Sequence, residues 1–134
     1  MTPAKPLALS SEDRLEIQEL GARYALAMDQ NDLTAWMATW SPQGIWEGRM
    51  GTYTGSIELK KLFSELDPRT RGKRHLLTNY VIDGDSGQAR QTCYMLIVEA
   101  KIGGNSTTTA VYQDQLTRLD GKWVFLRRQM NLDS

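Results

Sequence analysis

The chain contains a single histidine, His75, and the chemistry of an imidazole makes it the first candidate for a functional residue. An imidazole takes up and releases a proton near neutral pH, so it can act as a general base. Such a base needs a partner that fixes which ring nitrogen carries the proton, and a carboxylate does this well. The alternative interpretation is a structural histidine at the edge of a strand.

Asp29 is the candidate partner. It follows Ala27 and Met28 at the end of an apolar helical run, where a lone carboxylate is not buried without a partner. At the C-terminal end of a helix a carboxylate also meets the negative end of the helix dipole. This mismatch favours a functional role over a side chain that merely points into solvent.

Two further polar residues stand among apolar neighbours. Tyr24 lies on the apolar stripe of the first helix, and its hydroxyl, if buried, needs a hydrogen-bond partner that a ligand oxygen could supply. Periodicity alone would make Tyr24 a core residue. Arg128, in phase with inward apolar residues of the last strand, is either a paired structural charge or an anion clamp. Asp114 is the candidate for its paired partner.

Large side chains between the helices and the sheet are candidates for binding an apolar or aromatic substrate, with core packing as the alternative. The candidate substrate-binding residues are Trp36, Trp40, Trp46, Met50, Asn79 and Tyr112. One histidine and one cysteine cannot supply a protein metal site, and the glycines at 48, 51 and 55 do not form a phosphate loop. The sequence therefore predicts neither a metal nor a cofactor.

The elements that position these residues fall into two halves. Up to residue 74 the apolar residues recur mostly with a helical period. This pattern predicts helices over 11–29, over 33–40 and from Ser56 to residues 67–68, with a short strand pair over 45–54. We expect residues 41–44 to stop the second helix, residues 67–68 to end the third, and residues 69–74 to form a basic loop.

After residue 74 the period changes to two, which predicts strands over 74–83, 88–101, 106–119 and 122–131, separated by glycine-rich turns. Along the first of these strands, His75, Leu77, Asn79 and Val81 are expected to point to one face. Helices followed by an antiparallel meander are the α+β layout, in which the helices cover one face of the sheet.

Length and composition bound the remaining possibilities. The 134 residues suffice for one domain, and we expect residues 1–9 to form a flexible tail and residues 10–134 to form the domain. Lys plus Arg equals Asp plus Glu at 16 each, which argues against nucleic acid as a partner. No apolar run approaches the roughly 20 residues that span a membrane. The single cysteine, Cys93, fits a cytoplasmic location.

Taken in order and spacing, several short stretches resemble the SnoaL-like family of the nuclear transport factor 2-like superfamily. The matching stretches are residues 17–24, 27–29, 45–48, 51–55, 74–79, 112–114 and 120–123, followed by Arg128. This resemblance implies a cystatin-like fold, a cone-shaped α+β barrel in which three N-terminal helices pack on a curved sheet. The pocket of such a cone lies between the helices and the concave face of the sheet.

The resemblance also implies a function. The chain is similar to enzymes of this superfamily such as scytalone dehydratase, bile acid 7-alpha-dehydratase and hexachlorocyclohexane dehydrochlorinase. These enzymes use an Asp–His dyad to remove a carbon-bound proton while a leaving group departs. Asp29 and His75 occupy the dyad positions. Tyr24 matches a tyrosine of the bile acid enzyme, and Arg128 lines up with a last-strand arginine of the dehydrochlorinase.

We therefore expect a cofactor-independent lyase, of dehydratase or dehydrohalogenase type, that acts on a small apolar or polycyclic substrate. One alternative is an isomerase or cyclase of the ketosteroid or polyketide kind. Another is a non-catalytic binder of small molecules, or a partner that is similar to the small subunit of ring-hydroxylating dioxygenases. Because many members of the family are dimers or trimers, a homo-oligomer is expected.

Overall fold

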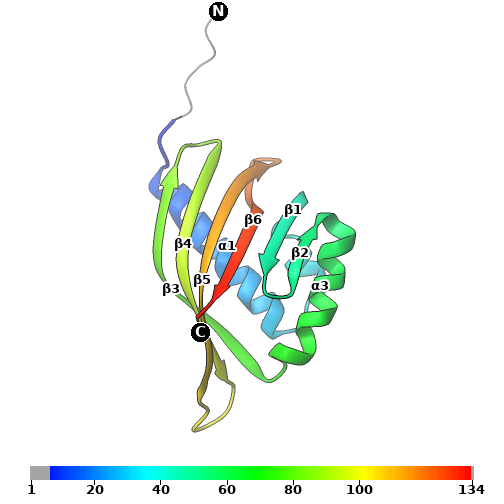
Figure 1. Cartoon of the computed structure of the whole chain (residues 1–134). Helices are drawn as coiled ribbons and strands as arrows, with labels where there is room; N and C mark the ends of the chain where they lie inside the picture. The colour runs from blue at the N-terminus through cyan, green and yellow to red at the C-terminus, as the bar shows by residue number, and fades with distance from the viewer. Residues whose placement is uncertain (1–6, 134) are drawn as a thin grey trace, which may run out of the picture.

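The computed structural model describes residues 7–133 as three helices and six strands (Figure 1). In chain order the elements are α1 (Ser11–Asp29), α2 (Leu33–Met37), β1 (Trp40–Gly48), β2 (Gly51–Thr54), α3 (Gly55–Thr70), β3 (Lys73–Gly84), β4 (Gln88–Glu99), β5 (Ser106–Leu119) and β6 (Lys122–Leu132). The predicted α+β layout of three helices packed on one sheet is confirmed.

The strands form one curved sheet in the order β2-β1-β6-β5-β4-β3. Every neighbouring pair is antiparallel except β1 and β6, which run parallel, so the sheet is mixed. Figure 1 shows α1 crossing behind the sheet and α3 beside β2. Because β2 and β3 are the two edges and do not pair with each other, the cone stays open.

Helix α1 begins at a capping box and ends at the candidate functional residue Asp29. The Ser10 hydroxyl accepts from the backbone N–H of Asp13, and the Asp13 carboxylate accepts from the backbone N–H of Ser10. These two bonds satisfy donors that the first turn leaves free. The helix then buries a stripe that includes Ile17, Leu20 and Tyr24. Its length delivers Asp29 to the end of the sheet where β3 begins.

The second helix is shorter than predicted, because it ends at Met37 and Trp40 is already the first residue of β1. The Thr39 hydroxyl donates to the Trp36 carbonyl at 2.6 Å and closes the last turn. The Thr39 carbonyl accepts from the N–H of Phe125 at 2.8 Å, which ties the chain to β6. Pro42 is tolerated in β1 because the pairing with β6 is interrupted between Trp40 and Ile45.

The third helix is longer than predicted, and the expected basic loop over 69–74 shrinks to Arg71 and Gly72. Pro68 lies inside α3 and is exposed, so the hydrogen bond that it cannot donate is lost on the solvent side. The last turn is held by the Arg71–Asp67 ion pair at 2.5 Å and by the bond from the Thr70 hydroxyl to the Leu66 carbonyl. Proline was therefore a poor stop signal here.

A bulge in β3 changes which residues face the core. Asn79 has a φ of +59°, and the pairing with β4 shifts register between Thr78 and Val81. Beyond the bulge Ile82 is buried, whereas Val81 is 66% exposed and Asn79 is exposed as well. The prediction that all four alternate residues from His75 to Val81 share one face is therefore wrong after Leu77, because the bulge inserts one extra residue.

The core between α1, α2 and the sheet is aromatic. The Tyr24 ring lies 5.5 Å from both Trp36 and Phe125, and Trp36 lies 5.6 Å from Trp40 and 5.1 Å from Phe63. Tilted and edge-to-face pairs at such distances add to the free energy that burial already supplies. This cluster packs α1, α2 and α3 against the sheet.

Residues 1–6 of the predicted flexible tail lie outside the described residues. The following residues are attached to the β3–β4 turn: the Leu7 carbonyl accepts from the N–H of Ser86 at 2.7 Å, and Ala8 pairs with Asp85. Leu9 packs against the core. Among residues 7–133, no helix combines the length and the apolar character that crossing a bilayer requires.

Candidate functional site

The imidazole of His75 and the carboxylate of Asp29 are in direct contact, although 46 positions separate them in the sequence. His75 Nδ1 lies 2.6 Å from Asp29 Oδ1, with 4% of the histidine side chain and 10% of the aspartate side chain exposed. An ionised carboxylate only accepts hydrogen bonds, so it keeps the proton on Nδ1 and leaves the lone pair on Nε2. The ring is thus set in the tautomer that a general base needs.

The end of α1 and the start of β3 fix this pair. Asp29 is the last residue of α1, and the backbone N–H of His75 donates to both of its carboxylate oxygens at 3.2 Å. Together with the ring contact, these bonds satisfy a carboxylate that would otherwise meet the negative end of the helix dipole. These hydrogen bonds hold the Asp29 carboxylate in place, and the carboxylate orients His75 through both its backbone and its side chain.

His75 lines a cavity of about 340 Å³ between α1, α3 and the concave face of the sheet. Most of the wall is apolar and comes from methionine, leucine, isoleucine and tryptophan side chains: Met28, Trp46, Met50, Leu66, Met95, Ile97, Met130 and Leu132. The polar lining residues besides His75 are Tyr24, Tyr112, Thr70, Thr108, Arg49, Arg69 and Lys73. A mostly apolar chamber with a few polar groups is typical of small-molecule sites.

Two tyrosines are among the residues that line this cavity. Tyr24 and Tyr112 are both buried, and their rings meet edge to face with centroids 6.3 Å apart. Burial raises the pKa of Tyr24 to about 12, against the opposing effect of the Arg128 charge. Burial likewise raises the pKa of Tyr112. Both phenols therefore stay protonated at neutral pH and can donate a hydrogen bond to a substrate oxygen.

Arg128, a candidate for stabilising developing negative charge, is fully buried and does not line the cavity. Its Nε and Nη2 donate to the two oxygens of Asp114 at 2.9 and 3.2 Å, and Gln91 donates to the same carboxylate at 3.0 Å. Burial lowers the pKa of Arg128, but the Asp114 charge together with Tyr112, Tyr24 and Cys93 outweighs this, and the net direction is upward. Of the two interpretations of Arg128, the contacts support a paired structural charge and do not support an anion clamp.

The Arg128 guanidinium also lies against the aromatic rings of the site. Its central carbon lies 3.5 Å from the ring centre of Tyr112 and 4.5 Å from that of Tyr24. Cation–π contacts of this kind hold ring orientation in a buried setting. Arg128 therefore packs against two residues of the cavity wall without lining the cavity itself.

The candidate substrate-binding residues divide into two groups. Trp46, Met50 and Tyr112 line the cavity. Trp36 and Trp40 lie instead in the aromatic core between α1, α2 and the sheet, and neither is among the residues that line the cavity. The periodicity of apolar residues in the sequence could not separate these positions, because the core and the cavity wall are both apolar.

Asn79, the remaining candidate, is exposed at the β3 bulge and lies outside the cavity lining. The sequence also missed lining residues, above all the cations Arg49, Arg69 and Lys73. Two of these belonged to a segment expected to be a solvated loop, but Arg69 lies in the longer α3 and Lys73 begins β3.

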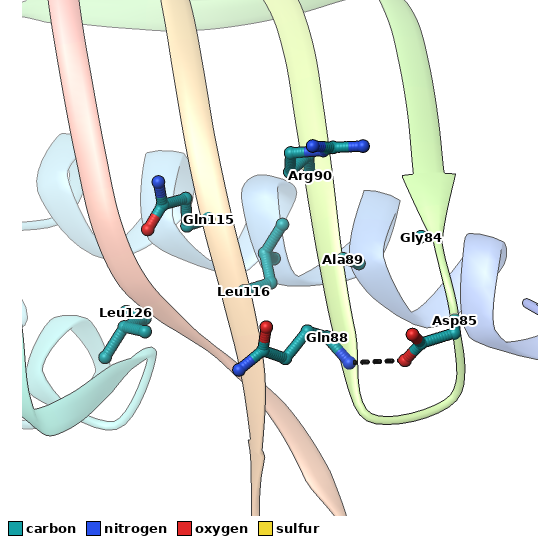
Figure 2. A pocket seen from close by; sticks show the side chains of 8 residues that line it. All are labelled: Gly84, Asp85, Gln88, Ala89, Arg90, Gln115, Leu116 and Leu126. Atoms are coloured by element: carbon teal, nitrogen blue, oxygen red, sulfur yellow. Dashed lines mark hydrogen bonds between the residues drawn. The ribbon is translucent and has the colours of Figure 1, made fainter. Parts of the chain in front are cut away.

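A second hollow lies at the opposite end of the sheet, by the β3–β4 turn (Figure 2). Its polar side chains include Asp85, Gln88 and Gln115. Figure 2 shows Asp85 pointing to the backbone of Gln88, and its Oδ1 accepts from the N–H groups of Gly87 and Gln88 at 2.8 and 3.0 Å. These bonds lower the pKa of Asp85 and give it the role of a turn cap. The eight residues that line this hollow include neither an imidazole nor a thiol.

Within residues 7–133, no three His, Cys, Asp or Glu side chains gather into a group that could hold a metal ion. The single cysteine, Cys93, is buried, and burial raises its pKa to about 11 against the Arg128 charge.

The open cone of helices on a mixed sheet defines the class: this is a cystatin-like fold of the nuclear transport factor 2-like type. A protein of unknown function with a cystatin-like fold from Nostoc punctiforme is 32% identical, with 95% of this chain and 96% of that chain covered and a TM-score of 0.91. An NTF2-like protein from Novosphingobium aromaticivorans is 24% identical, with 90% and 82% covered and a TM-score of 0.80.

Residues 10–129 match the SnoaL-like domain, and the chain belongs to the SnoaL-like family. A protein from Novosphingobium aromaticivorans assigned as a scytalone dehydratase shares the fold at 20% identity, with 92% of this chain and 85% of that chain covered and a TM-score of 0.80. No curated protein matches the chain. The family and fold expected from the sequence are thus confirmed.

Proposed function

We propose that this protein is a cofactor-independent lyase, of dehydratase or dehydrohalogenase type, in which His75 is the base and Asp29 orients it. The observation that carries the proposal is the 2.6 Å contact between His75 Nδ1 and Asp29 Oδ1 beside a largely apolar cavity. A histidine with only a structural role at the edge of a strand would not need a buried carboxylate to select its tautomer. A cytoplasmic location, in keeping with the unpaired Cys93, is part of the proposal.

In the proposed reaction, His75 Nε2 takes a proton from a substrate carbon. The electron pair of the broken C–H bond forms a C=C bond, and the leaving group departs with the pair of its own bond. Asp29 stabilises the imidazolium that forms. In a dehydration, the imidazolium returns the proton to the departing hydroxyl, which leaves as water. In a dehydrohalogenation, halide leaves and the proton passes to solvent.

The two tyrosines give this reaction its second component. Because both phenols stay neutral, either can donate a hydrogen bond to a substrate carbonyl as negative charge grows on its oxygen. The apolar wall strengthens such a bond by excluding water. Tyr24 and Tyr112 therefore take the role that the sequence had assigned to Tyr24 and Arg128.

A second candidate function uses the same groups. Two neutral phenols close together beside a base suit an isomerase or cyclase, which stabilises an enolate and returns the proton to another carbon. The mass of the product separates the two functions. Elimination lowers the mass by that of water or a hydrogen halide, whereas isomerisation leaves it unchanged.

The test is turnover of apolar β-hydroxy ketones, halogenated cyclic substrates and unsaturated ketones, with products measured by mass spectrometry. The His75→Ala variant should lose about 10²–10⁴-fold in rate, which is what a positioned base contributes. Thr78→Ala is the matched control, because Thr78 lies exposed on the same strand. Wild-type turnover by the His75→Ala variant would contradict the proposal. Binding of these compounds without turnover would favour a binding protein instead.

A further inference from the structure

We propose that the ligand of this cavity is an amphipathic anion: an apolar body that carries one carboxylate, sulfonate or phosphate group, which the cations of the cavity bind. This inference names the substrate class of the site and rests on the proposed function in placing the substrate there. The observations that carry it are the charges of the lining residues and the ion pairs around them.

Three cations from three parts of the chain line the cavity. Arg49 lies in the turn between β1 and β2, Arg69 in the last turn of α3, and Lys73 at the start of β3. Arg49 and Arg69 are exposed and Lys73 is half-buried. Lining residues that are also exposed lie at the opening, so these cations form the mouth of the chamber and the apolar side chains form its depth.

Within the described residues, no carboxylate forms an ion pair with these cations. No Asp or Glu lines the cavity, and none of the three cations forms an ion pair within residues 7–133. Lys73 has Glu99 as its cross-strand neighbour, but the Glu99 carboxylate pairs with Lys101 at 3.2 Å. The cations are therefore free to bind a ligand.

The other acids near this end of the molecule also have partners of their own. Glu47 pairs with Arg127 at 2.7 Å, and Glu65 accepts from the Tyr53 hydroxyl at 2.7 Å and lies 4.0 Å from the Lys61 ammonium. Asp29 is held by His75. The chain as a whole has a formal net charge of zero, so an unneutralised group of cations at one opening is a local excess. Such a group raises the local concentration of anions at the cleft.

An anionic group at the mouth would orient the ligand. With its charge against Arg49, Arg69 or Lys73 and its apolar body among the methionines, the ligand has one way to enter. The body then lies beside His75 and the tyrosine hydroxyls. Affinity for the uncharged part thus holds the reacting carbon near the base, as intramolecular positioning requires.

The experiment compares two fluorescent probes that share one apolar body: anilinonaphthalene sulfonate, which is anionic, and phenylnaphthylamine, which is neutral. The sulfonate should bind more tightly, and its advantage should shrink with rising salt. Single variants Arg49→Gln, Arg69→Gln and Lys73→Gln should each weaken sulfonate binding about two- to fivefold, the range for exposed charge pairs. Neutral probe binding should not change.

Two variants control the interpretation. Lys60→Gln removes an exposed cation of α3 that does not line the cavity, and it should leave both probes unaffected. Met130→Trp fills the cavity and should weaken both probes, with circular dichroism to verify folding. Displacement of the sulfonate by naphthoate, naphthyl phosphate and the neutral naphthylmethanol then ranks the anions. Both anions should displace better than the alcohol.

Equal binding of the two probes, or an unchanged sulfonate advantage in the triple Arg49→Gln/Arg69→Gln/Lys73→Gln variant, would overturn the inference. Because binding needs no turnover, this outcome is separable from the failure of the proposed function. The His75→Ala variant should keep the sulfonate advantage while it loses turnover. A chain without turnover that still prefers the sulfonate would be an anion-binding cavity without lyase activity.

Discussion

The guanidinium carbon of Arg128 lies 3.5 Å from the ring centre of Tyr112, while the same group donates twice to the buried carboxylate of Asp114. One cation thus connects a buried ion pair on the concave face of the sheet to a tyrosine that lines the cavity. The position of Tyr112 depends on charges that no ligand touches.

This relationship makes Asp114 a stability determinant. The Asp114→Asn variant leaves Arg128 buried without its counter-charge and should lower the free energy of unfolding by about 3–5 kcal/mol. The measurement is urea unfolding at neutral pH. A double variant Asp114→Leu/Arg128→Met should recover part of this loss, because no charge stays buried. A cost below about 1 kcal/mol for Asp114→Asn would show that the pair is not held as described.

Asp29 should act on rate through the orientation of His75. In Asp29→Asn the amide can still accept from the backbone N–H of His75, but its neutral oxygen stabilises the imidazolium poorly. We expect kcat to fall about 10²–10⁴-fold with little change in KM. The pH–rate profile should also shift, which a merely structural role would not produce. Unchanged kcat with a lower melting temperature would contradict the role in catalysis.

Tyr24→Phe and Tyr112→Phe separate the two hydroxyls while keeping the rings against Arg128. Loss of a hydroxyl that stabilises an oxyanion should lower kcat about 10²-fold or more. Because the rings remain, the melting temperature should change little. Steady-state kinetics on both variants therefore identifies which phenol contacts the substrate oxygen. A wild-type rate for both would exclude the tyrosines from the chemistry.

Asp13 should set the acid stability of the protein. Its pKa is lowered to about 2, chiefly by the N–H of Trp123, which donates to its carboxylate at 3.1 Å. Ser10 and Arg118 add to this effect. A carboxyl whose pKa is lower when folded stabilises the protein above its unfolded pKa, and this contribution is lost as pH falls through the folded pKa.

The free energy of unfolding of the wild type, measured with urea, should therefore decrease as pH falls from about 4 toward 2. The folded and unfolded pKa values of Asp13 set this window. In Asp13→Asn the same window should show a smaller change, because the group no longer titrates. At pH 7 that variant should be the less stable of the two. Parallel pH profiles for both proteins would contradict the assignment to Asp13.

Much of the fold could be predicted from periodicity. The four long strands and α1 follow patterns of two and of three to four residues, and such patterns depend on burial, which the fold preserves. Local signals made Asp29 and His75 candidates, because an acid at a helix end and a lone imidazole each lack an easy structural explanation. The family resemblance implied their pairing.

What could not be predicted depends on contacts between distant segments. Trp40 joins β1 because Thr39 bonds to Phe125, and Asn79 turns outward because a bulge with a positive φ interrupts the pairing with β4. Neither cause is visible within a window of neighbouring residues. The cations of the cavity were missed for the same reason, since α3 had to extend past Pro68 to bring Arg69 to the opening.

Because β1 pairs in parallel with β6, the sheet cannot be completed until β6 has been synthesised. β1 has only β2 and β6 as neighbours, and β6 is made last, some 80 residues after β1. During synthesis the β1–β2 pair and α3 therefore emerge before β6, the strand that joins them to the rest of the sheet. A chain truncated before β6 would lack Met130 and Leu132 of the cavity wall and the strand that pairs with β1 beside Trp46.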